Sequence, residues 1–533
     1  MNLRDQLKLS DIALSNNDFI KAKTLLEEAL KIYPDIFELN FKLGLVNNLL
    51  GNIKESINSY KKSISINPNF SPAYCNLGII YDKLNNKDLA IKNYLTAIEI
   101  DPKNSNAHYN LGNTYFNIEN LENAEKHYYL SISINPNNIY AYNNLLQIYD
   151  RTNNNIKLDE IVEKAKSVFG KNTIINFFEG ISEYKKNNYK KVIQIYKSLN
   201  LDPNDRIKNI VKTNILAKCY DHVGMYNEAF EFFEKSNNIT EDTYKNKFKK
   251  ENYINLIKDR MIFFSKINSK IFKNDTVKLD NHTDPVFLIG FPRSGTTLLD
   301  TILRTHESIE VLEEKPLIQN LINEINVNIK GDFSNLSKID DETIKKIRIA
   351  YFENRKKFLS INEKKIYIDK FPLNIIFIAE INRIFPKAKY ILALRNPCDV
   401  VLSCFMQSFD PNDAMSNFYN LKDTSNFYHM VMSLWTKYLE ILDIDTHIIK
   451  YEEIITNFDT SISSVINFLN LNWDNKLKEF NKTAEERGMI NTPSYNQVIK
   501  PLYKNSMGRW KNYNKQLDSY IPYLEKWILN FKY

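Results

Sequence analysis

A period of 34 residues governs the first part of the chain. Prolines recur at this spacing, at Pro34, Pro68, Pro102 and Pro136. Leucine–glycine pairs recur in the same phase at 43–44, 77–78 and 111–112, and a second leucine replaces the glycine at 145–146. Small residues and then aromatic residues follow further along each unit. Small residues let two helices approach closely and large ones fill the gap to the next unit, so the period predicts stacked helical hairpins.

This pattern resembles that of tetratricopeptide repeats, which share the 34-residue period. The resemblance covers residues 1–150 and implies an α-helical superhelix. From 151 to 240 the pattern continues in degraded form, with Pro203, Ala229 and Phe233 at the expected offsets, and predicts degenerate helical repeats. Such a superhelix binds an extended peptide or another protein in its concave groove and carries no chemistry of its own. We therefore expect a protein or peptide partner on the groove, whose identity the sequence leaves open.

The overall composition narrows the class of protein. Hydrophobic residues make up 43% of the chain and charged residues 25%, as in globular proteins, and the formal net charge of +7 is small for 533 residues. Without blocks of lysine or arginine, no nucleic-acid partner is expected. No apolar run approaches the roughly 20 residues of a membrane span, and the N-terminal residues lack the apolar core of a signal peptide. The expectation is a cytoplasmic protein.

A second kind of architecture begins after a linker. Residues 241–283 form a charged helical linker that ends among turn-forming Asn, Asp and Pro residues. From 284 to 533, short apolar runs alternate with helical segments, which predicts an α/β domain around a central parallel sheet. Ligands of such sheets bind at the carboxyl ends of the strands.

The stretch VFLIGFPRSGTTLLDTIL, residues 286–303, has the outline of a phosphate-binding loop between a strand and a helix. Gly290 and Gly295 keep the GxxxxG spacing of nucleotide triphosphatases, but Thr296 stands where their lysine grips phosphate. The loss of that lysine disfavours γ-phosphate transfer. The groups expected to face an anion are the backbone N–H groups and hydroxyls of Ser294, Gly295, Thr296 and Thr297 and the charge of Arg293.

A second loop lies in KYILALRNPCDVVLSCF. There the predicted strand 390–394 delivers Arg395 just before a helix expected to begin near Asp399. Arg395 and Ser403, eight residues apart, would converge on another anion. An arginine after a strand is common, so this loop alone is weak support for an anion site.

Together the two loops resemble those of sulfotransferases that use 3′-phosphoadenosine 5′-phosphosulfate. PRSGTT resembles the loop for the 5′-phosphosulfate, and RNPCDVVLS resembles the 3′-phosphate motif with Arg395 and Ser403 as ligands. The resemblance implies a P-loop-like sulfotransferase domain behind the superhelix. It also implies this nucleotide as the donor and no required metal, because the sulfuryl group is already activated.

The stretch FPRSGTTLLDTILRTHESIEVLEEKP is similar, without a gap, to the protein-tyrosine sulfotransferases. The resemblance implies that Glu314 is the catalytic base that takes the proton of the acceptor hydroxyl. It places Lys370, in DKFPLN, at the lysine that stabilises the leaving group. His306 is the alternative base, because cytosolic sulfotransferases of small molecules use histidine.

Resemblance continues in the C-terminal part. Tyr451, in KYEEII, matches the family's nucleotide-contacting tyrosine. PSYNQVIKPLYKNSMGRW resembles the segment that closes over the donor, which implies that Ser494 assists the leaving group. In the same segment Lys500 and Arg509 would hold the nucleotide phosphates.

The chain also departs from that family. Gln407 stands at a family arginine of the 3′-phosphate helix, and Lys315-Pro316 follow the base where the eukaryotic enzymes carry an arginine that selects acidic peptides. The fusion of repeats to this domain resembles the bacterial repeat-containing sulfotransferases. The acceptor hydroxyl is therefore left open among protein tyrosine, a glycan and a small metabolite.

Two rival functions belong to other classes. A nucleotide kinase or triphosphatase that replaced its lysine would turn over ATP with magnesium. A repeat-based interaction protein with an inactive nucleotide-binding domain would keep donor binding and lose nothing when Glu314 is removed.

Overall fold

The structure is a computed structural model that describes residues 3–267, 282–359, 365–486 and 506–533. The chain divides into two compact units, Met1–Leu201 and Asp202–Tyr533. The helices over 151–240 are shared between the two units, because the boundary falls inside this range.

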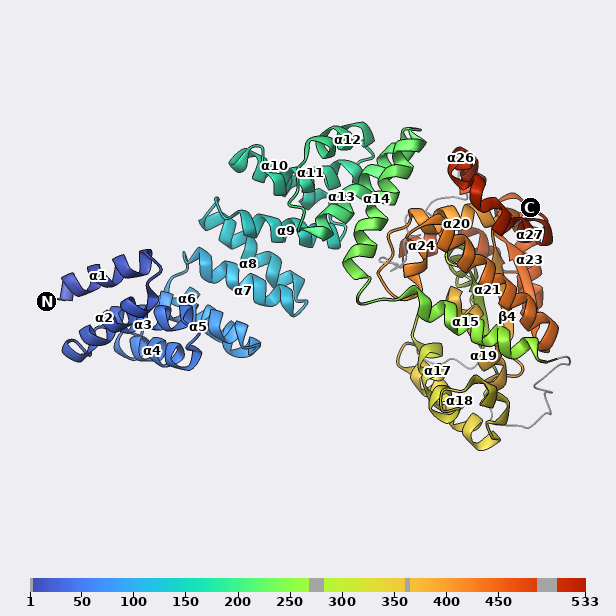
Figure 1. Ribbon diagram of the computed structural model, residues 1–533, viewed down its shortest axis with the longest axis horizontal. Helices are drawn as coiled ribbons and strands as arrows, with labels where there is room; N and C mark the ends of the chain where they lie inside the picture. Colours follow the sequence, from blue (N-terminus) through green and yellow to red (C-terminus); the bar gives the residue numbers. More distant parts are fainter. Residues whose placement is uncertain (1–2, 268–281, 360–364, 487–505) are drawn as a thin grey trace. The chain divides into compact units, whose positions relative to one another are not determined.

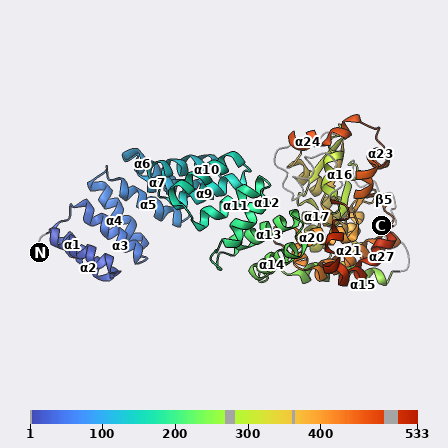
Figure 2. The same ribbon diagram turned by 90° about the horizontal axis from the view of Figure 1, so that it is seen from above.

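The first unit consists of antiparallel helix pairs that follow one another in chain order (Figures 1 and 2). The pairs are α1 (Leu3–Ser15) with α2 (Phe19–Ile32), α3 (Phe37–Leu49) with α4 (Ile53–Ile66), α5 (Ser71–Lys83) with α6 (Lys87–Ile100), α7 (Ser105–Asn117) with α8 (Leu121–Ile134), α9 (Ile139–Arg151) with α10 (Asn155–Phe169), and α11 (Thr173–Lys185) with α12 (Tyr189–Ser198). This is the predicted tetratricopeptide superhelix.

The turns within these pairs repeat at the sequence period. Each turn contains a residue with positive φ, and these residues are Asn17, Gly51, Asn85, Glu119, Asn153 and Asn187. Glycine and asparagine are the residues that adopt this conformation at the lowest cost. Because Asn153 and Asn187 keep the spacing, the repeat geometry continues beyond residue 150 as far as α12.

Tight packing inside each pair explains the leucine–glycine motif. A Cβ added to the glycine would come within 2.7 Å of a tyrosine ring on the second helix in four pairs, Gly44–Tyr60, Gly78–Tyr94, Gly112–Tyr128 and Gly180–Tyr196. At the equivalent positions of α9 and α10 stand Leu146 and Val162, both buried. The large side chain has therefore moved from the second helix to the first, which keeps the volume of the interface.

The second unit begins with three helices, α13 (Arg206–His222), α14 (Tyr226–Tyr244) and α15 (Lys250–Ser265). They pack on the α/β part of the unit, where Phe230 of α14 stacks on Phe405 at 4.9 Å between ring centroids. The Asn237 side chain donates a hydrogen bond of 2.9 Å to the backbone carbonyl of Phe405. Phe405 lies on α20 (Pro397–Met406), so α14 is joined to the helix that carries Ser403.

A parallel sheet of five strands forms the centre of this unit, in the order β2-β3-β1-β4-β5. The strands are β1 (Val286–Gly290), β2 (Ile309–Glu313), β3 (Ile366–Lys370), β4 (Lys389–Leu394) and β5 (Asp445–Lys450). The prediction of a central parallel sheet is confirmed. The helix expected near Asp399 begins at Pro397, because a proline fits the first helical position and Asn396 caps the helix by accepting from the N–H of Cys398.

Helices cover both faces of the sheet, as alternating side chains require. Val286 and Leu288 of β1 face a core shared with α16 (Thr296–Leu303), α23 (Phe458–Phe468) and α24 (Phe480–Glu486). Phe287 points the other way and meets Phe385 at the end of α19 (Ile378–Ile384), at 6.1 Å between ring centroids. Figure 2 shows α16, α23 and α24 above the sheet and α20 with α21 (Leu421–Ile441) below it.

The other elements of this unit are α17 (Leu317–Asn328), α18 (Asp341–Lys356), α22 (Tyr451–Thr456), α26 (Asn514–Leu517), α27 (Ile521–Asn530) and the short turns η1 (Phe333–Lys338), η2 (Pro372–Phe377), η3 (Met415–Phe418), η4 (Asn475–Glu479), η6 (Arg509–Tyr513) and η7 (Asp518–Tyr520). Among the helices within the described ranges, none has both the length and the apolar character that crossing a membrane requires.

Candidate active site

The carboxyl edge of the sheet collects the predicted site residues, one group from each strand. The loop 291–295 follows β1, Glu314 follows β2, and Lys370 ends β3. Arg395 follows β4 and Tyr451 follows β5. Since all five strands are parallel, their carboxyl ends meet at one edge, where open α/β sheets bind ligands.

The loop after β1 has an unusual backbone. Arg293 has φ of 69° and Gly295 has φ of 98°. A Cβ on Gly295 would lie 2.8 Å from the Tyr451 ring, so both the conformation and the close approach of the ring require glycine there. Tyr451 therefore packs against the loop, as expected for a residue that shapes the same site.

Polar groups of this loop are buried at the start of α16. Ser294 is 2% exposed, and its hydroxyl has no hydrogen-bond partner among the described residues. Thr296 and Thr297 are buried at the first two positions of the helix. A buried hydroxyl without a partner is costly, and an anion at the helix N-terminus would supply the missing bond. The loop therefore fits a phosphate-like group.

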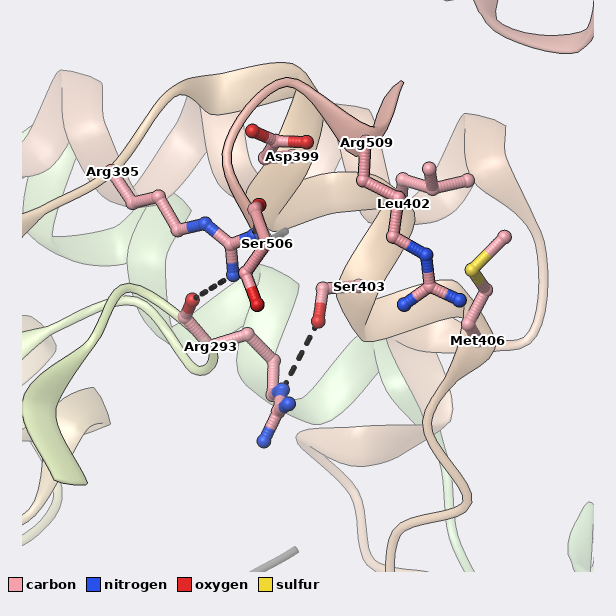
Figure 3. Close-up of a pocket in the computed structure, with 8 residues that line it drawn as sticks. All are labelled: Arg293, Arg395, Asp399, Leu402, Ser403, Met406, Ser506 and Arg509. Carbon is pink, nitrogen blue, oxygen red and sulfur yellow. Dashed lines mark hydrogen bonds between the residues drawn. The ribbon is translucent and has the colours of Figure 1, made fainter. Parts of the chain in front are cut away.

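Three guanidinium groups converge beside this loop. Arg293 donates from Nε to the Ser403 hydroxyl at 3.1 Å, and Arg395 donates from Nη1 to the Arg293 carbonyl at 3.3 Å. Arg395 also donates to the Ser506 carbonyl and lies 5.0 Å from the centroid of the Tyr451 ring. Figure 3 shows the three arginines around one pocket, whose lining residues are Arg293, Arg395, Asp399, Leu402, Ser403, Met406, Ser506 and Arg509.

Asp399 organises the wall of the pocket that carries Arg509. Its carboxylate accepts from the backbone N–H of Gly508 at 2.7 Å and of Trp510 at 2.9 Å. Both bonds fix the turn on either side of Arg509, so the guanidinium is presented from a rigid backbone. In the sequence, Asp399 marked only the expected start of a helix. Its place as an acidic residue in a first helical turn was the one sequence feature that could have pointed to this role.

A buried lysine lies at the other end of the edge. Lys370 is fully buried, and its ammonium is 2.7 Å from Glu314 Oε1 and 3.2 Å from Glu313 Oε1. Burial alone would lower the pKa of Lys370, but the negative charges of Glu314, Asp300 and Glu313 outweigh it and raise this pKa above its usual value. The ammonium is therefore charged at neutral pH. Glu313, which the sequence pattern leaves out of the site, is a second partner of the lysine.

Comparisons with known proteins agree with this geometry. A family model described as Sulfotransferase family matches residues 285–475. Models described as tetratricopeptide repeats match 6–36, 37–70, 59–92 and 105–138, and one described as TPR repeat matches 80–119. The chain joins tetratricopeptide repeats to a sulfotransferase-family domain.

Several relatives share parts of the chain. An uncharacterized protein of Aquifex aeolicus (strain VF5) is 24% identical over 383 residues, which are 68% of this chain and 48% of that protein. Protein-tyrosine sulfotransferase 1 of Danio rerio is 23% identical and covers 42% of this chain and 65% of its own length. Protein-tyrosine sulfotransferase A of Caenorhabditis elegans is 21% identical, and the match covers 46% of this chain and 67% of that protein. The chain thus spans about half of the first relative and about two thirds of the other two.

Two solved structures that are similar to part of this chain have low TM-scores. The crystal structure of MamA is 26% identical, with 36% of this chain and 99% of that chain covered and a TM-score of 0.27. The structure of YrrB is described as that of a TPR protein with an unusual peptide-binding site. It is 19% identical, the match covers 32% of this chain and 88% of that chain, and the TM-score is 0.27.

His306 of the sulfotransferase-family domain is held by both ring nitrogens. Nε2–H donates to the Asn472 carbonyl at 2.9 Å, and Nδ1 accepts from the backbone N–H of Ser308 at 3.1 Å. Both nitrogens of the ring are thus used in hydrogen bonds to the backbone, whereas the Glu314 side chain is 39% exposed. Glu314 is therefore the better placed of the two candidate bases.

Glu314 also has an unusual backbone, with φ of 49°. Its N–H donates to the Lys370 carbonyl at 2.8 Å, so the residue leaves β2 in a turn while still bonded to β3. Residues held in this region of φ are strained and are common at functional sites.

Neither Gln407 nor Lys315, the positions at which the sequence departs from the protein-tyrosine enzymes, is among the residues that line the pocket. Gln407 caps the end of α20 and donates from its side chain to the Ser408 carbonyl at 2.9 Å. The Lys315 ammonium lies 5.5 Å from the centroid of the Phe358 ring. Two predicted site residues, Ser494 and Lys500, lie outside the described residues.

Proposed function

We propose that this protein is a sulfotransferase that moves a sulfuryl group from 3′-phosphoadenosine 5′-phosphosulfate to an acceptor hydroxyl. One observation carries the proposal. A charged, fully buried lysine pairs with a partly exposed carboxylate at 2.7 Å, on the same sheet edge as two anion-binding loops. A nucleotide triphosphatase needs a lysine in its phosphate loop, where this chain has Thr296, and that makes ATP turnover the weaker candidate.

Each loop has a proposed share of the donor. The loop 293–297 binds the 5′-phosphosulfate, because the buried Ser294 hydroxyl needs a partner at the start of α16. The pocket of Arg395, Ser403 and Arg509 binds the 3′-phosphate, since guanidinium groups match phosphate geometry. Tyr451, whose ring packs against Gly295, contacts the nucleotide. Ser494 and Lys500 remain predictions for the same donor.

The proposed chemistry is an in-line displacement. Glu314 accepts the proton of the acceptor hydroxyl while the oxygen forms a bond to sulfur. The bond from sulfur to the bridging oxygen breaks, and its electron pair stays on the departing nucleotide bisphosphate. Lys370 stabilises that charge, and positioning together with charge stabilisation supplies most of the rate gain.

We propose protein tyrosine as the first acceptor to test, since two similar proteins are named protein-tyrosine sulfotransferases. The repeat array would bring an acceptor protein to the site, because such arrays bind peptides and proteins. Glycans and small metabolites are the alternative acceptors.

The test is transfer of label from a ³⁵S-labelled donor to a lysate. Label in protein that hydrolyses to tyrosine sulfate supports the tyrosine acceptor, and label in polysaccharide or small molecules reassigns it. The Glu314→Gln variant should lose the transfer, and Glu310→Gln is its matched control, since Glu310 lies on β2, the strand that Glu314 follows, and faces Lys365 at 3.8 Å. Failure to bind the bisphosphate product in calorimetry, or magnesium-dependent ATP turnover, would contradict the sulfotransferase proposal.

A further inference from the structure

Helix α13 reaches the wall of the anion pocket. The Asp221 carboxylate binds Arg509 Nη2 at 2.6 Å and accepts from the Tyr513 hydroxyl at 2.6 Å. The next helix contributes as well, because the Tyr226 ring meets the Tyr513 ring at 5.3 Å between centroids. The α13–α14 hairpin therefore holds the same segment that presents Arg509 to the pocket.

Lys218 lies three residues before Asp221 on α13, so the two side chains share one face of the helix. Burial, and then the positive charges of Arg293 and Arg509, lower the pKa of Lys218 to about 8. Both arginines line the pocket. Lys218 thus lies one helical turn from the carboxylate that holds Arg509 at the wall of the pocket.

Among the residues that the structure describes, cations outnumber carboxylates around the pocket. Four cations, Arg293, Arg395, Arg509 and Lys218, stand against two carboxylates. One of these, Asp399, is bound to backbone N–H groups. Among the described residues, none forms an ion pair with Lys218. Like charges held close together repel one another until an anion compensates them, so the cluster points to a multiply charged anion.

We propose that Lys218 is a further cationic ligand of the anion in this pocket, which makes the α13–α14 hairpin part of the donor site. The inference rests on the proposed function, in which the pocket takes the 3′-phosphate. It adds a residue from outside the two loops and from outside the region that the sulfotransferase family model matches, which begins at residue 285.

Binding of the anion at Lys218 would be coupled to protonation of the lysine. A bound phosphate raises the lysine pKa from about 8, so the complex takes up a proton above that pH. Below pH 7 the lysine is charged in both states, and affinity does not change with pH through it. The groups that face Lys218 are Arg293 and Arg509, with Cys219 and Asp221 on its own helix. Burial raises the pKa of Cys219 to about 12, so that thiol does not titrate in the same range.

The experiment measures binding of adenosine 3′,5′-bisphosphate to the full chain by calorimetry, at pH 7.0 and 8.5, in two buffers of different ionisation enthalpy. Adenosine 5′-monophosphate is the comparison ligand. The variants are Lys218→Ala, Lys218→Arg and, as a control, Lys208→Ala, because Lys208 lies on the same helix but pairs with Asp205 at 2.6 Å.

We expect Lys218→Ala to weaken bisphosphate binding about tenfold or more and to leave the monophosphate unchanged. It should also abolish proton uptake at pH 8.5. Lys218→Arg should keep most of the affinity without proton uptake, because arginine does not titrate there. The control should match the wild type in all respects.

Two outcomes would overturn the inference, and they are distinguishable. If Lys218→Ala binds the bisphosphate as tightly as the wild type and still takes up the proton, Lys218 is no ligand, while the proposed function stands. If the wild-type chain does not bind the bisphosphate, the proposed function fails and this inference fails with it.

Discussion

Glu314 and Lys370 lie 2.7 Å apart, yet their removal should slow the reaction for different reasons. Glu314→Gln removes the base, and we expect kcat to fall by about 10²–10⁴. Lys370→Ala removes the charge that meets the leaving group, and kcat should fall by about 10²–10³. A series of phenols of decreasing pKa separates the two effects. Acidic phenols need no base, so they should recover much of the rate in Glu314→Gln and little in Lys370→Ala.

The control for this series is bisphosphate binding, which Glu314→Gln should leave intact because the side chain is not part of the pocket. Equal recovery of both variants by acidic phenols would contradict the separate roles. An unchanged kcat in Glu314→Gln would favour His306, despite its two backbone hydrogen bonds.

How far the sequence could predict the site depends on where each residue lies along the chain. The loop 293–297 and the pair Arg395 and Ser403 are local patterns, because a strand end and the helix after it fix their positions. Asp221 and Arg509 are 288 residues apart, and only the packing of α13 on the C-terminal segment brings them together. No local pattern marks Lys218 or Asp221, so the sequence could not assign them.

The glycine–tyrosine packing of the repeats supports a prediction about elements. Gly78→Leu should lower the free energy of unfolding of the first unit by about 1–3 kcal/mol, because the leucine side chain would clash with the ring of Tyr94. Combining it with Tyr94→Val imitates Leu146 and Val162 of the next-but-one pair and should restore part of the loss. Chemical denaturation of the two single variants and the double variant gives the coupling energy.

Tyr94→Val alone serves as the reference, since it leaves a cavity over Gly78 and is expected to destabilise by itself. A stabilising coupling of about 0.5–3 kcal/mol is expected for residues in contact. Strictly additive effects would mean that the exchange of volume between the two helices does not explain the residues found in the fifth pair, α9 with α10.

The elements themselves were largely predictable, for a physical reason. In the repeats each hairpin packs on its neighbours, so the same small and large residues recur at the same spacing. The parallel strands were visible as short apolar runs because both of their faces are buried. The start of α20 was placed two residues late, since the sequence argument did not use Pro397 as the first helical residue.

At the scale of the whole chain, the described residues divide between Leu201 and Asp202 and not at the end of the repeat-like stretch. The hairpin α13–α14 resembles the repeats in sequence, but its side chains serve the second unit through Phe230 and Asp221. One part of the repeat pattern thus recruits a partner in our proposal, and the last part of it builds the donor site.

Two truncated chains test this division. A chain beginning at Asp202 keeps the whole second unit, so it should bind adenosine 3′,5′-bisphosphate as tightly as the full chain. Its transfer of label to acceptor proteins in a lysate should fall if the repeat array recruits them. A chain beginning at Lys249 lacks Lys218, Asp221 and the ring that stacks on Phe405, and it should lose most of its bisphosphate affinity. Calorimetry and thermal unfolding of both chains give the comparison. If the shorter chain folds and binds as well as the longer one, the hairpin is a spacer and the donor site ends at the sulfotransferase-family domain.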